Sequence, residues 1–160
     1  MDEVIALIRS FVHALQGICR GVATQRNLRI HFTALAIVIL AGYFAKLSTG
    51  HWCLVILCCV AVISLELINT SLEALCDRVT EDFDPKIKLA KDAAAGAVLI
   101  SAAGAIAIAL LLLFGENHYI DNIADTLRQR PWAFAVLAII VLAGLLFVFL
   151  PTWFQKRKRK

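Results

Sequence analysis

Apolar residues fill four long stretches of the chain, and polar residues collect between them. A helix needs roughly 20 mostly apolar residues to cross a membrane. Four stretches predict such helices, namely Ile30 to Phe44, Trp52 to Leu75, Ala93 to Phe114 and Trp132 to Leu150. The first stretch is short unless its flanks join it. The pattern therefore predicts an all-α, integral-membrane helical bundle with four spanning helices.

The segment before the first span, residues 1–29, has a different pattern. Its apolar side chains recur at a spacing of three and four, which places them on one side of a helix; they are Val4, Leu7, Ile8, Phe11, Leu15, Ile18 and Val22. A helix of this kind lies in the membrane interface, although the same pattern also fits packing against other protein. We expect an amphipathic interfacial helix over residues 1–29.

Composition supports a membrane protein and argues against two other classes. Of the 160 residues, 61% are hydrophobic and only 18% are charged, whereas soluble domains are nearer half apolar. The 16 Lys and Arg residues exceed the 12 Asp and Glu residues, but they lie between the apolar blocks, so no nucleic-acid partner is predicted. Five cysteines without a CxxC pair and scattered histidines indicate no zinc site.

Basic residues predict the orientation, because cytoplasmic flanks carry the excess of Lys and Arg. Thirteen of the 16 lie before the first span, between spans two and three, or in the tail at 151–160, and three (Lys46, Arg128 and Arg130) lie in the other connections. This distribution places both termini and a loop at 76–92 in the cytoplasm. A loop at 115–131 lies outside. The basic tail is expected to anchor the last span, 132–150, at anionic headgroups.

The second span contains two carboxylates at membrane depth, where charge is costly and usually functional. At about 100° per residue, one narrow stripe of this helix carries the polar side chains; they are Glu66, Asn69, Thr70, Glu73 and Asp77. Such a stripe can hold Mg²⁺, which prefers carboxylates and substrate phosphates, or supply a general base. The residues alone also allow mutual satisfaction within a bundle, or a relay of protons or ions.

The central loop adds Lys91 and Asp92 at the expected start of a helix rich in Ala and Gly. Helix N-terminal amides favour phosphate, and Lys91 can meet phosphate charge as a point cation. Asp92 can bind a metal or cap the helix. Small residues along this third span permit close helix contacts within or between subunits.

These motifs together resemble a known family. The runs that carry the resemblance are Glu66-Leu67-Ile68-Asn69-Thr70-Ser71-Leu72-Glu73-Ala74-Leu75-Cys76-Asp77, Ala90-Lys91-Asp92-Ala93-Ala94-Ala95-Gly96-Ala97-Val98 and Arg26-Asn27-Leu28-Arg29-Ile30-His31. They resemble the prokaryotic diacylglycerol kinase and undecaprenol kinase family over about residues 9 to 114, with the motifs in order.

The resemblance implies a small kinase of the bacterial inner membrane, a homotrimer with sites between neighbouring subunits, which transfers the γ-phosphoryl group of MgATP to a lipid hydroxyl. It implies that Glu66 is the general base and that Asn69 is a positioning group. Glu73 would bind Mg²⁺ and nucleotide, and Lys91 with Asp92 would bind nucleotide. In-line positioning, a metal and a base are what phosphoryl transfer requires.

The chain departs from the family pattern in three places. Gln25 stands where the family usually has an acidic metal ligand, and a neutral amide is the weaker Mg²⁺ partner. Glu73, Asp92 or Asp77 would then have to compensate, so Gln25 and Asp77 are kept as possible metal contacts. Asp84-Pro85 stands where the family often has His-Pro or His-Glu, so Asp84 is left out of the expected site. The span at 132–150 has no counterpart in the three-span core at 30–114.

The motifs look slightly closer to the undecaprenol branch, which makes undecaprenol the expected acceptor and diacylglycerol the alternative. Two interpretations of another kind stay open: a small channel or transporter in which Glu66 and Glu73 carry protons or cations, and a non-catalytic family member, which Gln25 would permit.

Overall fold

The computed structural model describes residues 2–80, 82–115 and 119–149, and these segments form six helices and no strand. The helices are α1 (Asp2–Thr24), α2 (Arg26–Ala45), α3 (Thr49–Val79), α4 (Pro85–Phe114), α5 (Tyr119–Gln129) and α6 (Pro131–Phe149). Four of them, α2, α3, α4 and α6, are long and apolar enough to cross a membrane. The predicted all-α bundle with four spans is confirmed.

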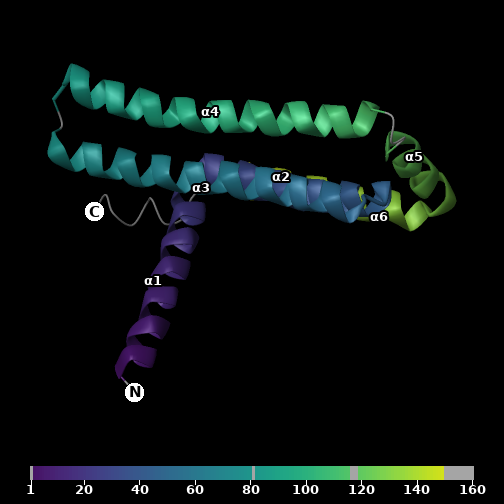
Figure 1. The fold of residues 1–160 in the computed structure, drawn as a ribbon, viewed down its shortest axis with the longest axis horizontal. Coiled ribbons are helices and arrows are strands. Elements are labelled where there is room, and N and C mark those ends of the chain that lie inside the picture. The colour runs from purple at the N-terminus through teal and green to yellow at the C-terminus, as the bar shows by residue number, and fades with distance from the viewer. Residues whose placement is uncertain (1, 81, 116–118, 150–160) are drawn as a thin grey trace.

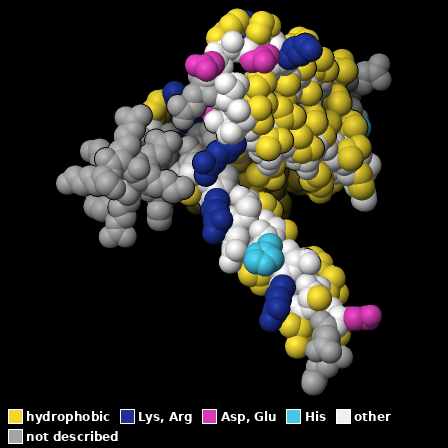
Figure 2. All heavy atoms as spheres, turned by 90° about the vertical axis from the view of Figure 1, so that its left-hand side faces the viewer, with side chains coloured by type: hydrophobic (Ala, Val, Ile, Leu, Met, Phe, Trp, Pro, Cys, Tyr) yellow, Lys and Arg dark blue, Asp and Glu magenta, His cyan; other side chains and the backbone are white. Residues whose placement is uncertain are grey.

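The four spanning helices run side by side, with α4 beside α3 and with α6 beside α2 (Figure 1). Helix α1 leaves the bundle at a steep angle where α2 begins. If the spanning helices cross the bilayer, α1 therefore runs along its surface. Seen from the α3–α4 end, apolar side chains cover most of the visible bundle surface, whereas charged side chains lie along one edge of it and on α1 (Figure 2). This arrangement is typical of a membrane protein.

The predicted boundaries are wrong at the N-terminus. The interfacial helix was expected over residues 1–29, but α1 ends at Thr24 and residues 26–29 already belong to α2. Gln25 separates the two helices, because its backbone is extended (φ −103°, ψ 122°). The added residues lengthen the first span to 20 residues, about 30 Å at 1.5 Å per residue, which matches the hydrocarbon thickness.

The predicted loop at 76–92 is largely helical. Helix α3 continues to Val79 and α4 begins at Pro85, so the connection covers only residues 80–84. Asp84 starts α4, because its carboxylate accepts the backbone N–H groups of Lys86 (2.7 Å) and Ile87 (3.2 Å), and proline suits the first helical position. Asp92 lies two turns inside α4, so neither a cap at Asp92 nor a helix N-terminus at Lys91 exists.

The segment at 115–131 contains a helix, α5, which the sequence analysis treated as loop. It is held by polar contacts: Asn122 donates to the carbonyl of Ala45 (3.0 Å), and the Tyr119 hydroxyl lies 2.8 Å from Nδ1 of His51. The last span begins at Pro131 and is described to Phe149. Leu150 and the basic tail at 151–160 lie outside the described residues.

Helices α2 and α6 cross closely at Gly144. A Cβ atom there would overlap the methyl group of Thr33, and Thr is stiff at χ1 in a helix. We expect Gly144→Ala to lower the free energy of unfolding by about 1–3 kcal/mol, the usual cost of overpacking. Gly104→Ala is the matched control, since a Cβ atom at Gly104 meets nothing within 4 Å.

Thermal unfolding of both variants in detergent checks this prediction. Gly104→Ala should raise the melting temperature slightly, because alanine is the better helix former by about 1 kcal/mol. Equal melting temperatures for the two variants would show that the α2–α6 crossing is looser than described.

Candidate active site

The polar stripe of α3 begins with two buried side chains. Glu66 is only 3% exposed and Asn69 only 5% exposed, although both lie in an apolar helix. The side chains of Asn27 and His31 on α2 interact with the Glu66 carboxyl group. These two residues are one helical turn apart and so share a face of α2. The start of α2 therefore covers Glu66.

Asn69 connects this buried carboxyl group to the next one along the stripe. Its side-chain amide donates a hydrogen bond to Oε1 of Glu73 (3.1 Å). Its carbonyl oxygen is buried and has no hydrogen-bond partner. A buried polar atom without a partner is costly. Asn69 thus presents an unused acceptor beside the half-buried carboxylate of Glu73.

The cytoplasmic-loop residues fall into two ion pairs. Lys91 of α4 reaches Asp77 of α3, with Nζ 2.5 Å from Oδ1, and Lys88 pairs with Asp92 (3.6 Å) within α4. The structure therefore joins Lys91 to the α3 stripe through Asp77. Asp92 is exposed and points to Lys88 instead, so it does not share a partner with Lys91.

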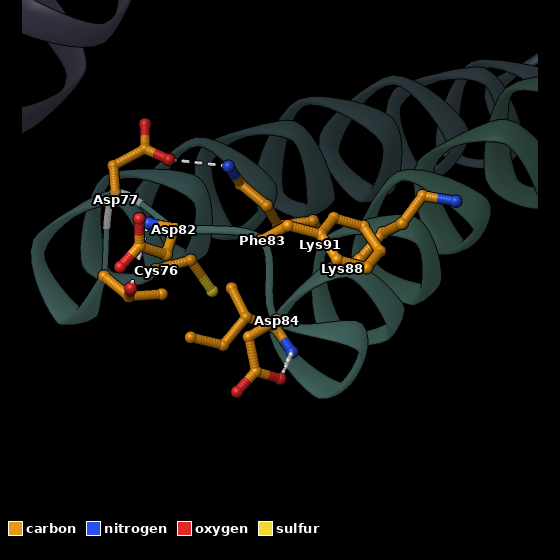
Figure 3. A pocket seen from close by; sticks show the side chains of 9 residues that line it. Cys76, Asp77, Asp82, Phe83, Asp84, Lys88 and Lys91 are labelled. Carbon is orange, nitrogen blue, oxygen red and sulfur yellow. Dashed lines mark hydrogen bonds and ion pairs between the residues drawn. The ribbon is translucent and has the colours of Figure 1, made fainter.

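A cavity of about 490 Å³ lies between the end of α3 and the start of α4 (Figure 3). It is lined by Cys76, Asp77, Thr80, Asp82, Phe83, Asp84, Ile87, Lys88 and Lys91. The lining mixes carboxylates, the two lysines and one aromatic ring. Both lysines are engaged by carboxylates, so an anionic ligand would compete with Asp77 for Lys91.

Gln25 lies at the junction of α1 and α2. It occupies the N-cap position of α2, yet its side chain makes no capping hydrogen bond. The side chain is half-buried, and it is left available for another contact. No group of three or more His, Cys, Asp or Glu side chains in the described ranges could hold a metal by itself.

Several residues of this region have no role that the sequence pattern predicts. Asn27 and His31 belong to the run that resembles the family, but their interaction with Glu66 depends on how α2 packs against α3. The i, i+4 spacing of the two residues was the available signal. Thr80, Asp82 and Phe83 line the cavity because the α3–α4 connection is short, which the predicted long loop concealed.

Residues 12–113 match the family described as prokaryotic diacylglycerol kinase. The chain belongs to the prokaryotic diacylglycerol kinase family. The chain is therefore a membrane lipid kinase, and the matched region contains α2, α3 and nearly all of α4.

Two relatives of this diacylglycerol kinase family carry different substrate names. The undecaprenol kinase of Bacillus subtilis is 39% identical over 111 residues, which cover 69% of this chain and 90% of the relative. The diacylglycerol kinase of Synechocystis is also 39% identical, over 109 residues, which cover 67% of this chain and 62% of the relative. A Helicobacter pylori diacylglycerol kinase is 35% identical over 95 residues. No solved structure matches significantly.

Proposed function

We propose that this kinase transfers the γ-phosphoryl group of ATP to the hydroxyl group of undecaprenol, with diacylglycerol as the alternative acceptor. The observation that carries the proposal is the polar stripe of α3. Along it, Glu66, Asn69 and Glu73 follow one another from the buried part of the bundle toward the cavity that Lys91 lines, called the Lys91 cavity below. The Bacillus subtilis undecaprenol kinase, matched over 90% of its length, supports undecaprenol as the first acceptor to test.

Glu66 is the proposed general base. It lies at membrane depth among apolar helices, and a carboxylate there can accept the proton of a lipid hydroxyl as the oxygen attacks phosphorus. Asn69 is the proposed positioning group. Its amide is fixed by Glu73 and its free carbonyl oxygen faces the same stripe.

The donor set fits Mg²⁺. This ion usually takes one or two protein carboxylates and completes its shell with phosphate oxygens and water, and Glu73 supplies one carboxylate with the unpartnered Asn69 oxygen beside it. When bound, Mg²⁺ would neutralise charge on the transferring phosphates. Asp77 is a possible further ligand, although it is paired with Lys91.

The phosphates of ATP are proposed to bind at Lys91, at the edge of the 490 Å³ cavity. Asp77 orients the ammonium group before nucleotide arrives. Asp92 would contribute through Lys88, with which it pairs. In Figure 1, α3 and α4 extend past the break between α1 and α2, and the cavity lies at their tip. Nucleotide would therefore bind beyond the level at which α1 leaves the bundle.

The orientation follows from charge. The end of the bundle that carries the cavity holds Arg78, Lys86, Lys88 and Lys91, whereas the opposite end holds Lys46, Arg128 and Arg130. By the positive-inside rule, the cavity end faces the cytoplasm, which supplies ATP. We place the chain in the bacterial inner membrane with both termini inside. A homotrimer is the proposed assembly, and native mass spectrometry would count its subunits.

The experiment that tests the proposal is phosphoryl transfer from labelled ATP in detergent micelles with Mg²⁺. Undecaprenol, diacylglycerol and no lipid are compared. Labelled undecaprenyl phosphate as the main product would support the proposal, and labelled phosphatidic acid would select the alternative acceptor. Folded protein that phosphorylates neither lipid, or that conducts ions without nucleotide, would contradict it.

Lys91→Met tests the phosphate contact. The substitution removes the charge and keeps most of the chain length. A charge-assisted hydrogen bond contributes about 1.5–3 kcal/mol, so we expect the KM for ATP to rise about tenfold or more. Lys86→Met is the matched control and should change KM less than about threefold, because Lys86 is exposed and does not line the cavity. An equal rise in KM for the two variants would contradict a phosphate contact at Lys91.

Gln25→Glu tests the neutral amide at the junction. A carboxylate binds Mg²⁺ more strongly than an amide does, and it also suits the start of α2. We expect the Mg²⁺ concentration for half-maximal activity to fall about threefold or more, on the scale of a 0.7 kcal/mol change. Gln129→Glu at the far end of the bundle serves as the control, and a matching fall there would contradict the prediction.

A further inference from the structure

Arg29 is a cationic side chain that α2 carries into a buried position. It lies in the second turn of α2 and is only 8% exposed, and its Nε atom is buried without a hydrogen-bond partner. In the described part of the chain, no acidic side chain forms an ion pair with it. A buried Nε–H group without an acceptor among apolar helices is costly, and an anion bound at Arg29 would satisfy it.

The anion cannot come from the helices on either side. Neither α2 nor α6 contains an Asp or Glu residue. The buried carboxyl group of α3, Glu66, interacts with Asn27, His31 and Glu73, and Arg29 is absent from its partners. At about 100° per residue, Asn27 and His31 lie on a different face of α2 from Arg29. Arg29 therefore points away from the proposed active site.

The face that carries Arg29 is the one that α6 covers. Arg26, Arg29 and Thr33 lie within an arc of about 60° on α2. Thr33 packs on Gly144 of α6, and the Arg26 guanidinium lies 4.9 Å from the ring centre of Phe149 at the end of α6. Two contacts, one on each side of Arg29 along the helix, thus place it in the seam between α2 and α6.

Thr33 adds a second unused polar atom to the same seam. Its hydroxyl oxygen is buried and makes no hydrogen bond. The seam therefore contains the guanidinium group of Arg29 and, one turn farther along, the hydroxyl group of Thr33. The guanidinium group of Arg26 lies at the end of the seam. Guanidinium groups bind phosphate through paired, charge-assisted hydrogen bonds, and basic pockets between spanning helices bind anionic headgroups.

We propose that the seam between α2 and α6 binds the phosphate group of an anionic membrane lipid, with Arg29 as the main contact and with Arg26 and Thr33 as supporting contacts. The site is separate from the kinase centre, because α3 does not contribute to it. It belongs to the part of the chain where α6 is added to the three-span core. The lipid would connect the added helix to α2 at the bilayer surface.

The test measures binding without ATP, so its result does not depend on the proposed kinase reaction. The full chain, purified and delipidated in uncharged detergent, is titrated in native mass spectrometry with phosphatidylglycerol or phosphatidylcholine, and in a separate arm with inorganic phosphate. We expect Arg29→Gln to weaken phosphatidylglycerol binding about tenfold, the scale of one charge-assisted contact. Arg9→Gln, which removes an exposed charge on α1, should change it less than twofold.

Two further variants keep the test decisive if Arg29→Gln folds poorly. Thr33→Val preserves the shape that packs on Gly144 and should weaken binding about threefold, as expected for loss of one neutral hydrogen bond. Arg29→Lys should retain part of the affinity. Binding of inorganic phosphate that depends on Arg29 would assign the site to free phosphate as well as to lipid. Unchanged binding in Arg29→Gln and Thr33→Val, or an equal loss in Arg9→Gln, would overturn the proposal.

Discussion

Glu66→Gln is expected to lower phosphoryl transfer by at least about a hundredfold while the protein stays folded. General acid–base catalysis contributes about 10²–10⁴-fold, and an amide cannot accept the proton of the lipid hydroxyl. The substitution keeps the size of the side chain and removes a carboxyl group that is 97% buried, since Glu66 is only 3% exposed. The melting temperature should therefore stay equal or rise, because a buried charge costs stability.

Labelled ATP with the preferred lipid measures the rate, and a fluorescent nucleotide measures ATP binding separately. ATP binding should be unchanged, because Glu66 lies in the covered part of the stripe and does not line the Lys91 cavity. Asp125→Asn is the matched carboxyl-to-amide control; Asp125 is exposed on α5 and lies 4.0 Å from Arg128, and its loss should leave the rate unchanged. Full activity in Glu66→Gln would reject its role as base.

Spanning helices were predictable because their signal is simple. A long apolar run has one stable solution in a membrane, the helix, so four spans could be identified from residue type alone. Their ends depend on local contacts that the apolar pattern does not encode. The junction at Gln25 and the cap at Asp84 are such contacts, and Asp84 was passed over in favour of Asp92 because the third span was counted only from its apolar part.

The candidate site could be predicted only where it lies on one helix. Glu66, Asn69 and Glu73 follow from helical spacing within α3, and the hydrogen bond between Asn69 and Glu73 matches that spacing. Contacts between helices could not be derived in the same way. The Lys91–Asp77 pair and the contact of Asn27 with Glu66 depend on the register of α3 against α4 and α2, which small apolar residues specify only weakly.

Helix α5 shows the same limit at the other end of the bundle. It is only 11 residues long and its apolar side chains alternate with polar ones, so the pattern predicts a loop, yet hydrogen bonds to the end of α2 hold it in place. Asn122 and Thr126 both donate to carbonyl groups of α2, those of Ala45 and Phe44 (3.0 and 3.3 Å). Those carbonyls are unpaired at any helix C-terminus, so α5 satisfies them in place of water.

Glu73→Gln is expected to raise the Mg²⁺ concentration for half-maximal activity about tenfold or more and to lower the maximal rate by about a hundredfold. A metal ion supplies several kcal/mol of charge stabilisation in phosphoryl transfer, and a hundredfold loss corresponds to about 2.7 kcal/mol. Glutamine can still accept the hydrogen bond that Asn69 donates, so the variant removes the charge and preserves the contact. A Mg²⁺ titration at saturating ATP and lipid gives both values.

Asp77→Asn tests the alternative metal position, because Asp77 lies one turn farther along the same stripe, although it is paired with Lys91. Its loss should change the Mg²⁺ requirement less than about threefold, since an exposed ion pair contributes only about 0–1 kcal/mol. A shift in Asp77→Asn as large as that in Glu73→Gln would move the metal to the end of α3. An unchanged Mg²⁺ requirement in Glu73→Gln would leave Asn69 and Glu73 as a structural pair, and the burial of the Asn69 oxygen would then need another explanation.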